Sequence, residues 1–135
     1  MKRFLLVALA LTLGSCSSWI TIGYQNATAL NLDCVLFSDV QALANGKLAA
    51  PPVAYDATLY ARVYADINNC EVVYNTIPKS GLSLGQLGLL KTSIEMFRLR
   101  DSMGASKAFF EINAPMLDST ASEIRNLEIS KLVQP

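Results

Sequence analysis

Apolar residues recur at intervals of three and four along most of this chain, a spacing typical of amphipathic α-helices. The first such run covers residues 26–45 and the second covers residues 53–70, each with charged residues on its other side. A third run extends from Ser83 to Met103, and two weaker ones cover residues 105–113 and 120–133. The pattern therefore predicts an all-α fold, a small bundle of four to five helices.

Glycine, proline and capping residues mark the predicted ends of these helices. Asn45-Gly46 suits a helix C-terminus, because glycine adopts the left-handed conformation that is common there. Pro51-Pro52 suits the start of the second helix, where the first turn leaves its amide hydrogens unpaired. Ser83 and Gln86 resemble a capping box, and Pro115 is expected to separate the last two helical segments.

The first sixteen residues follow a different pattern. Lys2 and Arg3 precede an apolar run from Phe4 to Leu13, and Leu13-Gly14-Ser15 then precedes Cys16. A basic start, a short apolar run and small residues at a cleavage site are the parts of an export signal. The run is shorter than the roughly 20 apolar residues that span a bilayer. An ordinary secretory peptide cut near Ser15 and an uncleaved membrane anchor are the alternatives.

These residues resemble the signal and lipobox of bacterial lipoproteins. The resemblance implies that residues 1–15 are removed as a signal peptide and that acyl chains, palmitate among them, are attached to Cys16. Residues 16–25 are then a lipidated tether, and residues 26–135 a single helical domain. By the sorting rule of enteric lipoproteins, Ser17 in place of an aspartate implies carriage to the outer membrane, with the domain on its periplasmic face.

The distribution of charge along the sequence argues against a nucleic-acid partner. The whole chain has 11 basic and 11 acidic residues, and loss of Lys2 and Arg3 with the signal leaves nine against eleven. No basic cluster remains in the mature sequence, so a nucleic-acid partner is not expected. The acyl chains would supply the affinity for the membrane.

The cysteines divide into one plus two. With Cys16 acylated, Cys34 and Cys70 remain in an exported chain, where a pair of thiols most simply forms one disulfide. Two separately buried thiols are the alternative. The chain has no histidine, and two thiols cannot fill a tetrahedral zinc site, so neither a metal nor another cofactor is expected.

The sequence gives little support for catalysis. The absence of histidine excludes Ser-His and Cys-His nucleophile pairs. No serine lies three residues before a lysine, so the Ser-x-x-Lys pattern of penicillin-binding acylases is missing as well. The carboxylates are scattered along the chain without a local pair. We therefore expect a protein that is not an enzyme.

Four side chains are candidates for contact with a partner. Tyr60 and Tyr64 lie on the apolar stripe of the second predicted helix, and tyrosine is enriched at protein interfaces. Arg98 and Arg100 belong to the densest group of charges. Core packing is the alternative for the tyrosines, and a solvated helix face is the alternative for the arginines.

Together these features predict a non-catalytic envelope lipoprotein whose helical bundle binds another envelope protein. An assembly factor or an exclusion factor fits this description, and in size and helical design the chain resembles the secretion pilotins. The alternative is an envelope hydrolase or an inhibitor of a cell-wall enzyme. A shallow apolar groove would favour the first reading, and a deep pocket with convergent carboxylates would favour the second.

Overall fold

The computed structural model describes residues 27–133, so the predicted signal peptide, Cys16 and the tether lie outside the described residues. The chain is helical over residues 27–48 and then forms α2 (Ala57–Tyr74), α3 (Gly81–Ser102) and α4 (Lys107–Val133). No strand occurs between residues 27 and 133. The predicted all-α class is confirmed, with four helices in this range.

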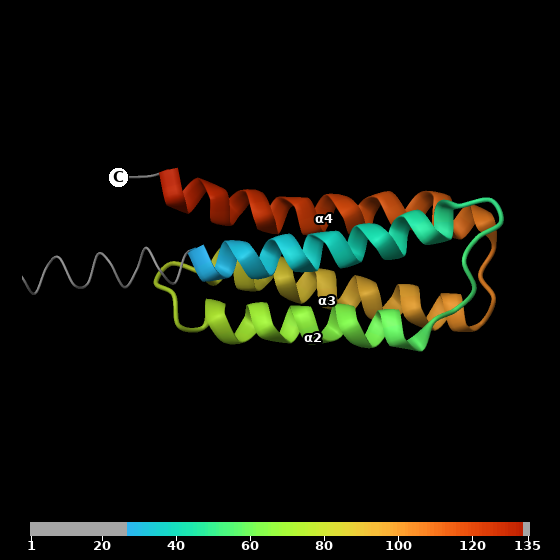
Figure 1. Ribbon diagram of the computed structural model, residues 1–135, viewed down its shortest axis with the longest axis horizontal. Helices are drawn as coiled ribbons and strands as arrows, with labels where there is room; N and C mark the ends of the chain where they lie inside the picture. Colours follow the sequence, from blue (N-terminus) through green and yellow to red (C-terminus); the bar gives the residue numbers. More distant parts are fainter. Residues whose placement is uncertain (1–26, 134–135) are drawn as a thin grey trace, which may run out of the picture.

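The four helices run alternately in opposite directions along one long axis (Figure 1). α2 packs against α3, and α3 packs against α4. The helix of residues 27–48 lies between α2 and α4: Arg62 of α2 pairs with its Asp39, and the guanidinium of Arg125 on α4 lies over the ring of its Phe37. The short connections join neighbouring antiparallel helices, as in other up-and-down bundles.

Apolar side chains from all four helices fill the interior. On α2 the buried positions follow the predicted spacing of three and four, and each fully buried aliphatic or aromatic side chain contributes about 1.5–3 kcal/mol. At one end of the bundle the rings of Phe97, Phe109 and Phe110 pack with centroids 5.3–5.7 Å apart. The largest fully buried apolar side chains are Tyr60, Tyr74, Phe97, Leu36, Leu43, Ile67, Leu87, Leu90, Ile94 and Ile124.

Two predicted helix ends differ from the structure, the first by two residues and the second by about a turn. The first helix continues through Asn45-Gly46 to residue 48, because Lys47 is buried and anchors this turn to the interior. Pro51-Pro52 lies in the loop that follows, and α2 begins only after Asp56. The carboxylate of Asp56 accepts hydrogen bonds from the amides of Thr58 and Leu59, at 2.8 and 3.4 Å, so an aspartate N-cap sets this boundary.

The predicted capping box at Ser83 and Gln86 is also wrong. α3 begins at Gly81, so Ser83 lies inside its first turn, fully buried, where it donates to Glu128 of α4 at 2.6 Å. The other end of α3 is followed by Gly104, whose φ of +75° is a left-handed conformation that glycine adopts without strain.

α4 is one helix, whereas the sequence predicted two segments divided at Pro115. Proline removes one amide donor and leaves the carbonyl of Glu111, four residues earlier, without its helical partner. Both Pro115 and Glu111 lie on the exposed side of α4, where water can hydrate that carbonyl. The buried residues Ala114 and Leu117 hold the helix to the core on either side of the proline.

The predicted disulfide is not found, and Cys34 and Cys70 are both free thiols. Cys70 is buried on α2, as the apolar stripe predicted, but Cys34 is exposed. The buried stripe of the first helix passes through Ala29, Asp33 and Leu36, and Cys34 is one residue, about 100° of helix rotation, away from it. The alternative of two buried thiols is therefore right for Cys70 only.

Within residues 27–133, no helix combines the length and the apolar character needed to cross a bilayer.

Candidate functional site

Tyr60, one of the predicted partner-binding residues, lies in the interior of the bundle. Its side chain is only 1% exposed, and its hydroxyl donates to the carboxylate of Asp101 on α3 at 2.8 Å. Burial raises the pKa of Tyr60 first, and the hydrogen bond to Asp101 raises it further. The alternative of core packing is thus right for Tyr60, and the prediction of a contact with a partner is wrong.

Tyr64 and Arg98 lie together on the surface between α2 and α3. Both donate to the carboxylate of Glu95, Arg98 at 2.8 Å. These two hydrogen bonds lower the pKa of Glu95, while partial burial and the bond to Glu95 raise the pKa of Tyr64 to about 12. Their polar groups pair with one another, so this group is a satisfied surface network.

α3 carries a second apolar stripe, on the side away from the core. Leu82, Leu89, Met96 and Met103 are seven residues apart, which places them on one side of the helix. Their exposed fractions are 63%, 62%, 54% and 71%. Sequence reasoning missed this stripe, although its seven-residue spacing was visible beside the buried one.

Two shallow hollows adjoin this stripe and share Met96. One, of about 560 Å³, lies between α3 and α4 and is lined by Met96, Arg100, Met103 and Phe109 among others. The other, of about 500 Å³, lies towards α2 and includes Tyr64 and Leu99. A small cleft of about 60 Å³ between Met96 and Met116 extends the surface onto α4.

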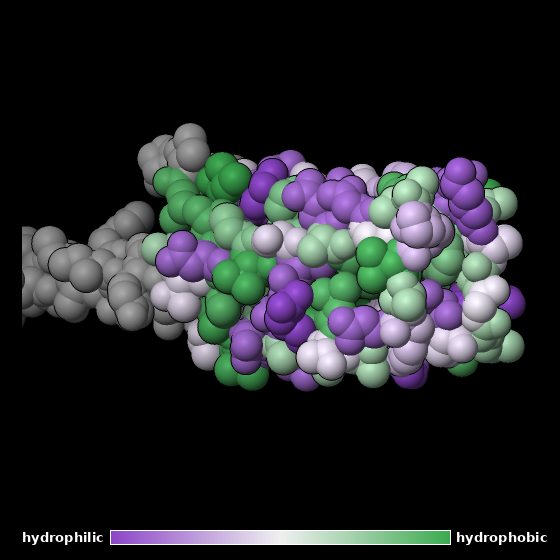
Figure 2. Space-filling model, turned by 45° about the vertical axis from the view of Figure 1, so that its right-hand side comes forward, coloured by the Kyte–Doolittle hydropathy of each residue, from purple (hydrophilic) through white to green (hydrophobic). Residues whose placement is uncertain are grey.

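We call the surface formed by Met96, Leu99, Met103 and Met116 the methionine face. Each of these side chains is more than half exposed, and they include every methionine of the chain after Met1. Exposed apolar side chains also occur elsewhere, as Figure 2 shows for one face, where green groups lie among purple ones and next to the grey residues. The methionine face is distinguished by the hollows that its side chains line.

Arg100 is the charged residue of the larger hollow. The neighbouring cations are paired within the chain: Arg98 with Glu95 at 2.8 Å, and Lys107 with Glu111 at 3.3 Å. No carboxylate among residues 27–133 forms an ion pair with Arg100. The hollow thus combines apolar walls with one positive charge that is available to a ligand.

A buried ion pair closes the end of the bundle where the first helix finishes. Lys47, 3% exposed, pairs with Asp101 at 2.7 Å and donates to the backbone carbonyls of Val53 and Ala54 at 2.7 and 3.1 Å. Asp101 also accepts from Tyr60. We call Lys47, Tyr60 and Asp101 the Lys47 cluster; it contains one positive and one negative charge.

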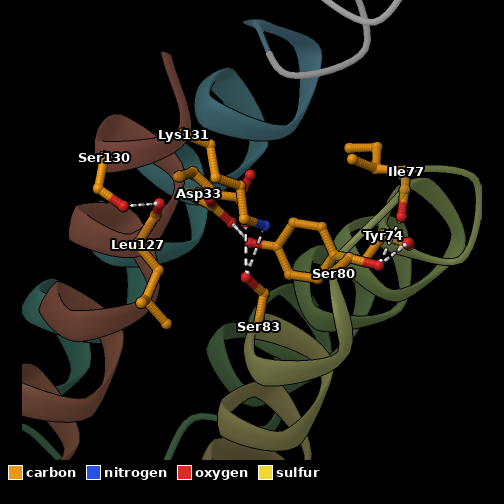
Figure 3. A network of polar contacts seen from close by, with 9 residues as sticks. Asp33, Tyr74, Ile77, Ser80, Ser83, Leu127, Ser130 and Lys131 are labelled. Atoms are coloured by element: carbon orange, nitrogen blue, oxygen red, sulfur yellow. Dashed lines mark hydrogen bonds and ion pairs between the residues drawn. The ribbon is translucent and has the colours of Figure 1, made fainter. Parts of the chain in front are cut away.

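A second buried polar group lies at the opposite end (Figure 3). Asp33 from the first helix, Tyr74 from α2, Ser83 from α3 and Lys131 from α4 point towards one another there. Tyr74 donates to Asp33, while Ser83 and Lys131 donate to Glu128. We call Asp33, Tyr74, Ser83, Glu128 and Lys131 the Asp33 cluster.

Burial changes the acidity of the Asp33 cluster. Desolvation raises the pKa of Asp33 to about 7 and the negative charge of Glu128 adds to this rise, against the opposing effects of the Tyr74 hydroxyl and Lys131. Desolvation likewise raises the pKa of Cys70, whose thiol lies beside Asp33. Asp33 is therefore a neutral acid over much of the range below pH 7.

Ser83 and Lys131 are close enough to resemble a serine–lysine nucleophile pair. The ammonium nitrogen of Lys131 is 2.9 Å from the hydroxyl oxygen of Ser83. A nucleophilic serine needs a neutral base and access to substrate. Here Lys131 forms an ion pair with Glu128, and the side chain of Ser83 is fully buried. The geometry fits a structural network better than a catalytic one.

Residues 27–133 also contain no group of three or more cysteine, aspartate or glutamate side chains placed to hold a metal ion.

No family model, curated protein or solved structure matches this chain.

Proposed function

We propose that this protein is a non-catalytic envelope lipoprotein, anchored through acylated Cys16, whose helical domain binds another envelope protein at the methionine face. The anchor follows from the lipobox pattern of Leu13, Gly14, Ser15 and Cys16. The proposed location is the periplasmic face of the outer membrane, as Ser17 implies. An assembly role of the pilotin kind, or exclusion of a competing element, would use such a tethered binding domain.

The observation that carries this proposal is the exposure of the methionine face. Large apolar side chains exposed together are costly in water and mark interaction sites when they surround a hollow. Methionine suits such a site because its unbranched, polarisable side chain adapts to the shape of a partner. Met96 lines both main hollows, so it is the centre of the proposed contact.

The partner's chemistry follows from the shape and charge of this surface. A face about two turns long, formed by side chains of α3 and α4, fits an amphipathic helix that lays its apolar side into the groove. Arg100, which lines the same hollow as Met103, favours a partner with one negative charge at this position. We therefore expect the bound segment to be a helix with apolar residues on one side and an aspartate or glutamate that meets Arg100.

The alternative function, an envelope hydrolase or an inhibitor of a cell-wall enzyme, has less support. Among residues 27–133, the contact between Ser83 and Lys131 is the arrangement that most resembles catalytic machinery. A hydrolase requires that its nucleophile reach substrate, and Ser83 is enclosed by the helices.

Site-specific photo-crosslinking in cells tests the proposal. A photoreactive residue at Met96 of the full-length protein is expected to capture one envelope protein, whereas the same residue at Val72, a 68% exposed position on α2, captures none. Peptide mapping should place the crosslink on an amphipathic helix with an acidic residue. Arg100→Glu should abolish capture, and a lysine at that acidic position of the partner should restore it.

Three results would contradict the proposal. Equal capture from Met96 and Val72 would show that the methionine face has no special role. Capture of only a second copy of this chain would show that the methionine face is a dimer contact. A crosslink that is unchanged in Arg100→Glu would show that the charge of Arg100 does not contribute to binding.

A further inference from the structure

The two buried polar clusters differ in their balance of charge. In the Lys47 cluster, one lysine pairs with one aspartate, and the lysine also donates two hydrogen bonds to backbone carbonyls. In the Asp33 cluster, the single lysine, Lys131, faces two carboxyl groups. Asp33 is 1% exposed and Glu128 is fully buried, so water does not screen a surplus of negative charge there.

The hydrogen bonds of the Asp33 cluster do not make up for this surplus. Tyr74 donates to one oxygen of Asp33, and Ser83 and Lys131 both donate to one oxygen of Glu128. The second oxygen of Asp33 and the second oxygen of Glu128 are buried and have no hydrogen-bond partner among the described residues. A buried carboxylate with a bare oxygen is costly, and a proton removes that cost.

Every described helix packed around Asp33 contributes a titratable or polar group, and of these groups within residues 27–133 one, Lys131, is basic. α2 presents the Tyr74 hydroxyl and the Cys70 thiol, α3 presents the Ser83 hydroxyl, and α4 presents Glu128 and Lys131. When both carboxyl groups are ionised, two negative charges share one ammonium group. When one proton is present, the charges cancel.

We propose that the Asp33 cluster is a proton-dependent latch, closed while Asp33 holds a proton and loosened when that proton is lost to solvent. The latch joins the start of the first helix to the end of α4, because Asp33 and Glu128 lie on those two elements. Loss of the proton places two negative charges against each other across this contact. The Lys47 end of the bundle has no such pair and stays closed.

The direction of titration agrees with this geometry. The pKa of Asp33 is raised to about 7, so the closed state holds a proton at a pH where an exposed aspartate has lost it. Opening then releases a proton between about pH 4 and pH 7, and the open fraction increases as the pH rises through that window. Above the pKa of the closed state the effect reaches a plateau.

The proposal concerns the folded domain and holds whether or not the chain is lipidated. In the sequence, the residues assigned to the tether directly precede the first helix. Loosening at this end would therefore act near the membrane attachment, while the methionine face keeps its structure.

Hydrogen exchange of the full chain, followed by mass spectrometry at pH 5, 6, 7 and 8, tests the latch. After correction for the intrinsic exchange rates, protection of residues 27–40 and 121–133 is expected to fall roughly thirtyfold or more between pH 5 and pH 7. Protection around Lys47 and Asp101 serves as the internal control and is expected to change less than about threefold.

Asp33→Asn should remove most of the pH dependence at the Asp33 end, because the amide stays neutral over this range. Should this variant fail to fold, Glu128→Gln serves in its place, since it leaves one carboxyl group facing Lys131 and should reduce the dependence. Asp66→Asn is the matched control: this aspartate on α2 also has a raised pKa, about 6, but lies beside Asp39 outside the cluster. It should keep the full effect in residues 121–133, the part of α4 that carries Glu128 and Lys131.

Three outcomes would overturn the proposal. One is protection at the Asp33 end that does not change with pH in the wild-type chain. Another is an equal loss at both ends, which would make the proton a determinant of the whole fold instead of a latch. The third is a pH dependence that survives unaltered in both Asp33→Asn and Glu128→Gln.

Discussion

Tyr60 and Tyr74 lie near opposite ends of α2, and each donates its hydroxyl hydrogen bond to a buried aspartate on another helix. For Tyr60 the acceptor is Asp101 on α3, and for Tyr74 it is Asp33 on the first helix. In both cases the partner is 41 residues away in the sequence. One helix thus positions both polar ends of the bundle, and the apolar core lies between them.

The stability of the folded chain should decrease as the pH rises from 5 to 8. Asp33, with its pKa raised to about 7, binds a proton in the folded state that the unfolded chain has released, so folding is favoured at low pH and the advantage is lost through pH 7. The full effect is of the order of 3 kcal/mol. Urea unfolding at four pH values measures it.

Asp33→Asn should flatten most of that profile and raise the free energy of unfolding at pH 8. Asp66, with its pKa raised to about 6, leaves a smaller dependence of the same sign at lower pH. A wild-type chain that is more stable at pH 8 than at pH 5 would contradict this prediction.

Replacement of Lys47 should be strongly destabilising. Lys47→Met leaves Asp101 buried with the Tyr60 hydroxyl as its remaining partner, and such an uncompensated charge costs about 3–5 kcal/mol. The double variant Lys47→Met, Asp101→Asn should recover most of this loss, because a neutral amide can still accept from Tyr60. Thermal or urea unfolding of the two variants decides the matter; a loss below about 1 kcal/mol for the single variant would mean that the pair is solvated.

One cysteine should react in the folded mature protein and two in the unfolded one. Cys34 is exposed, whereas Cys70 is buried and desolvation raises its pKa, which keeps its reactive thiolate scarce. Maleimide labelling with and without denaturant, read by mass spectrometry, gives the count. If no thiol reacts after unfolding without a reductant, a Cys34–Cys70 disulfide exists and this description of the pair is wrong.

Two glycines should respond to alanine in opposite directions. Gly104 has a φ of +75°, so Gly104→Ala is expected to cost about 1 kcal/mol or more. Gly85 lies on the exposed side of α3, and a methyl group there would have no neighbour within 4 Å. Gly85→Ala should therefore stabilise the chain by up to about 1 kcal/mol through helix propensity, as thermal unfolding of both variants would show.

The sequence predicted the helices and their buried stripes because both depend on local spacing. Val63, Ile67 and Cys70 repeat at helical intervals, and they are buried in the structure. Local spacing predicted the helix ends less well. Asn45-Gly46 is typical of a helix C-terminus, but burial of Lys47 extends the helix past it. Proline usually interrupts a helix, but α4 continues through Pro115 because the residues on either side pack against the core.

The polar features of the interior depend on residues far apart in the chain. Nothing near Asp33 or Glu128 in the sequence indicates that they share a cluster, since that follows from how the first helix and α4 pack. The same holds for Lys47 and Asp101. Met96 and Met103 are a different case, because their seven-residue spacing is visible in the sequence. The spacing was overlooked because another apolar stripe already explained why this segment is helical.

We propose that lipid on Cys16 attaches this domain to the envelope. The most direct measurement is mass spectrometry of the N-terminal peptide of the protein isolated from cell membranes. We predict a chain that begins at Cys16 and carries the mass of its acyl chains, and a Cys16→Ser variant that carries none. A chain that still begins at Met1, or one that begins near residue 16 without a lipid, would contradict the claim.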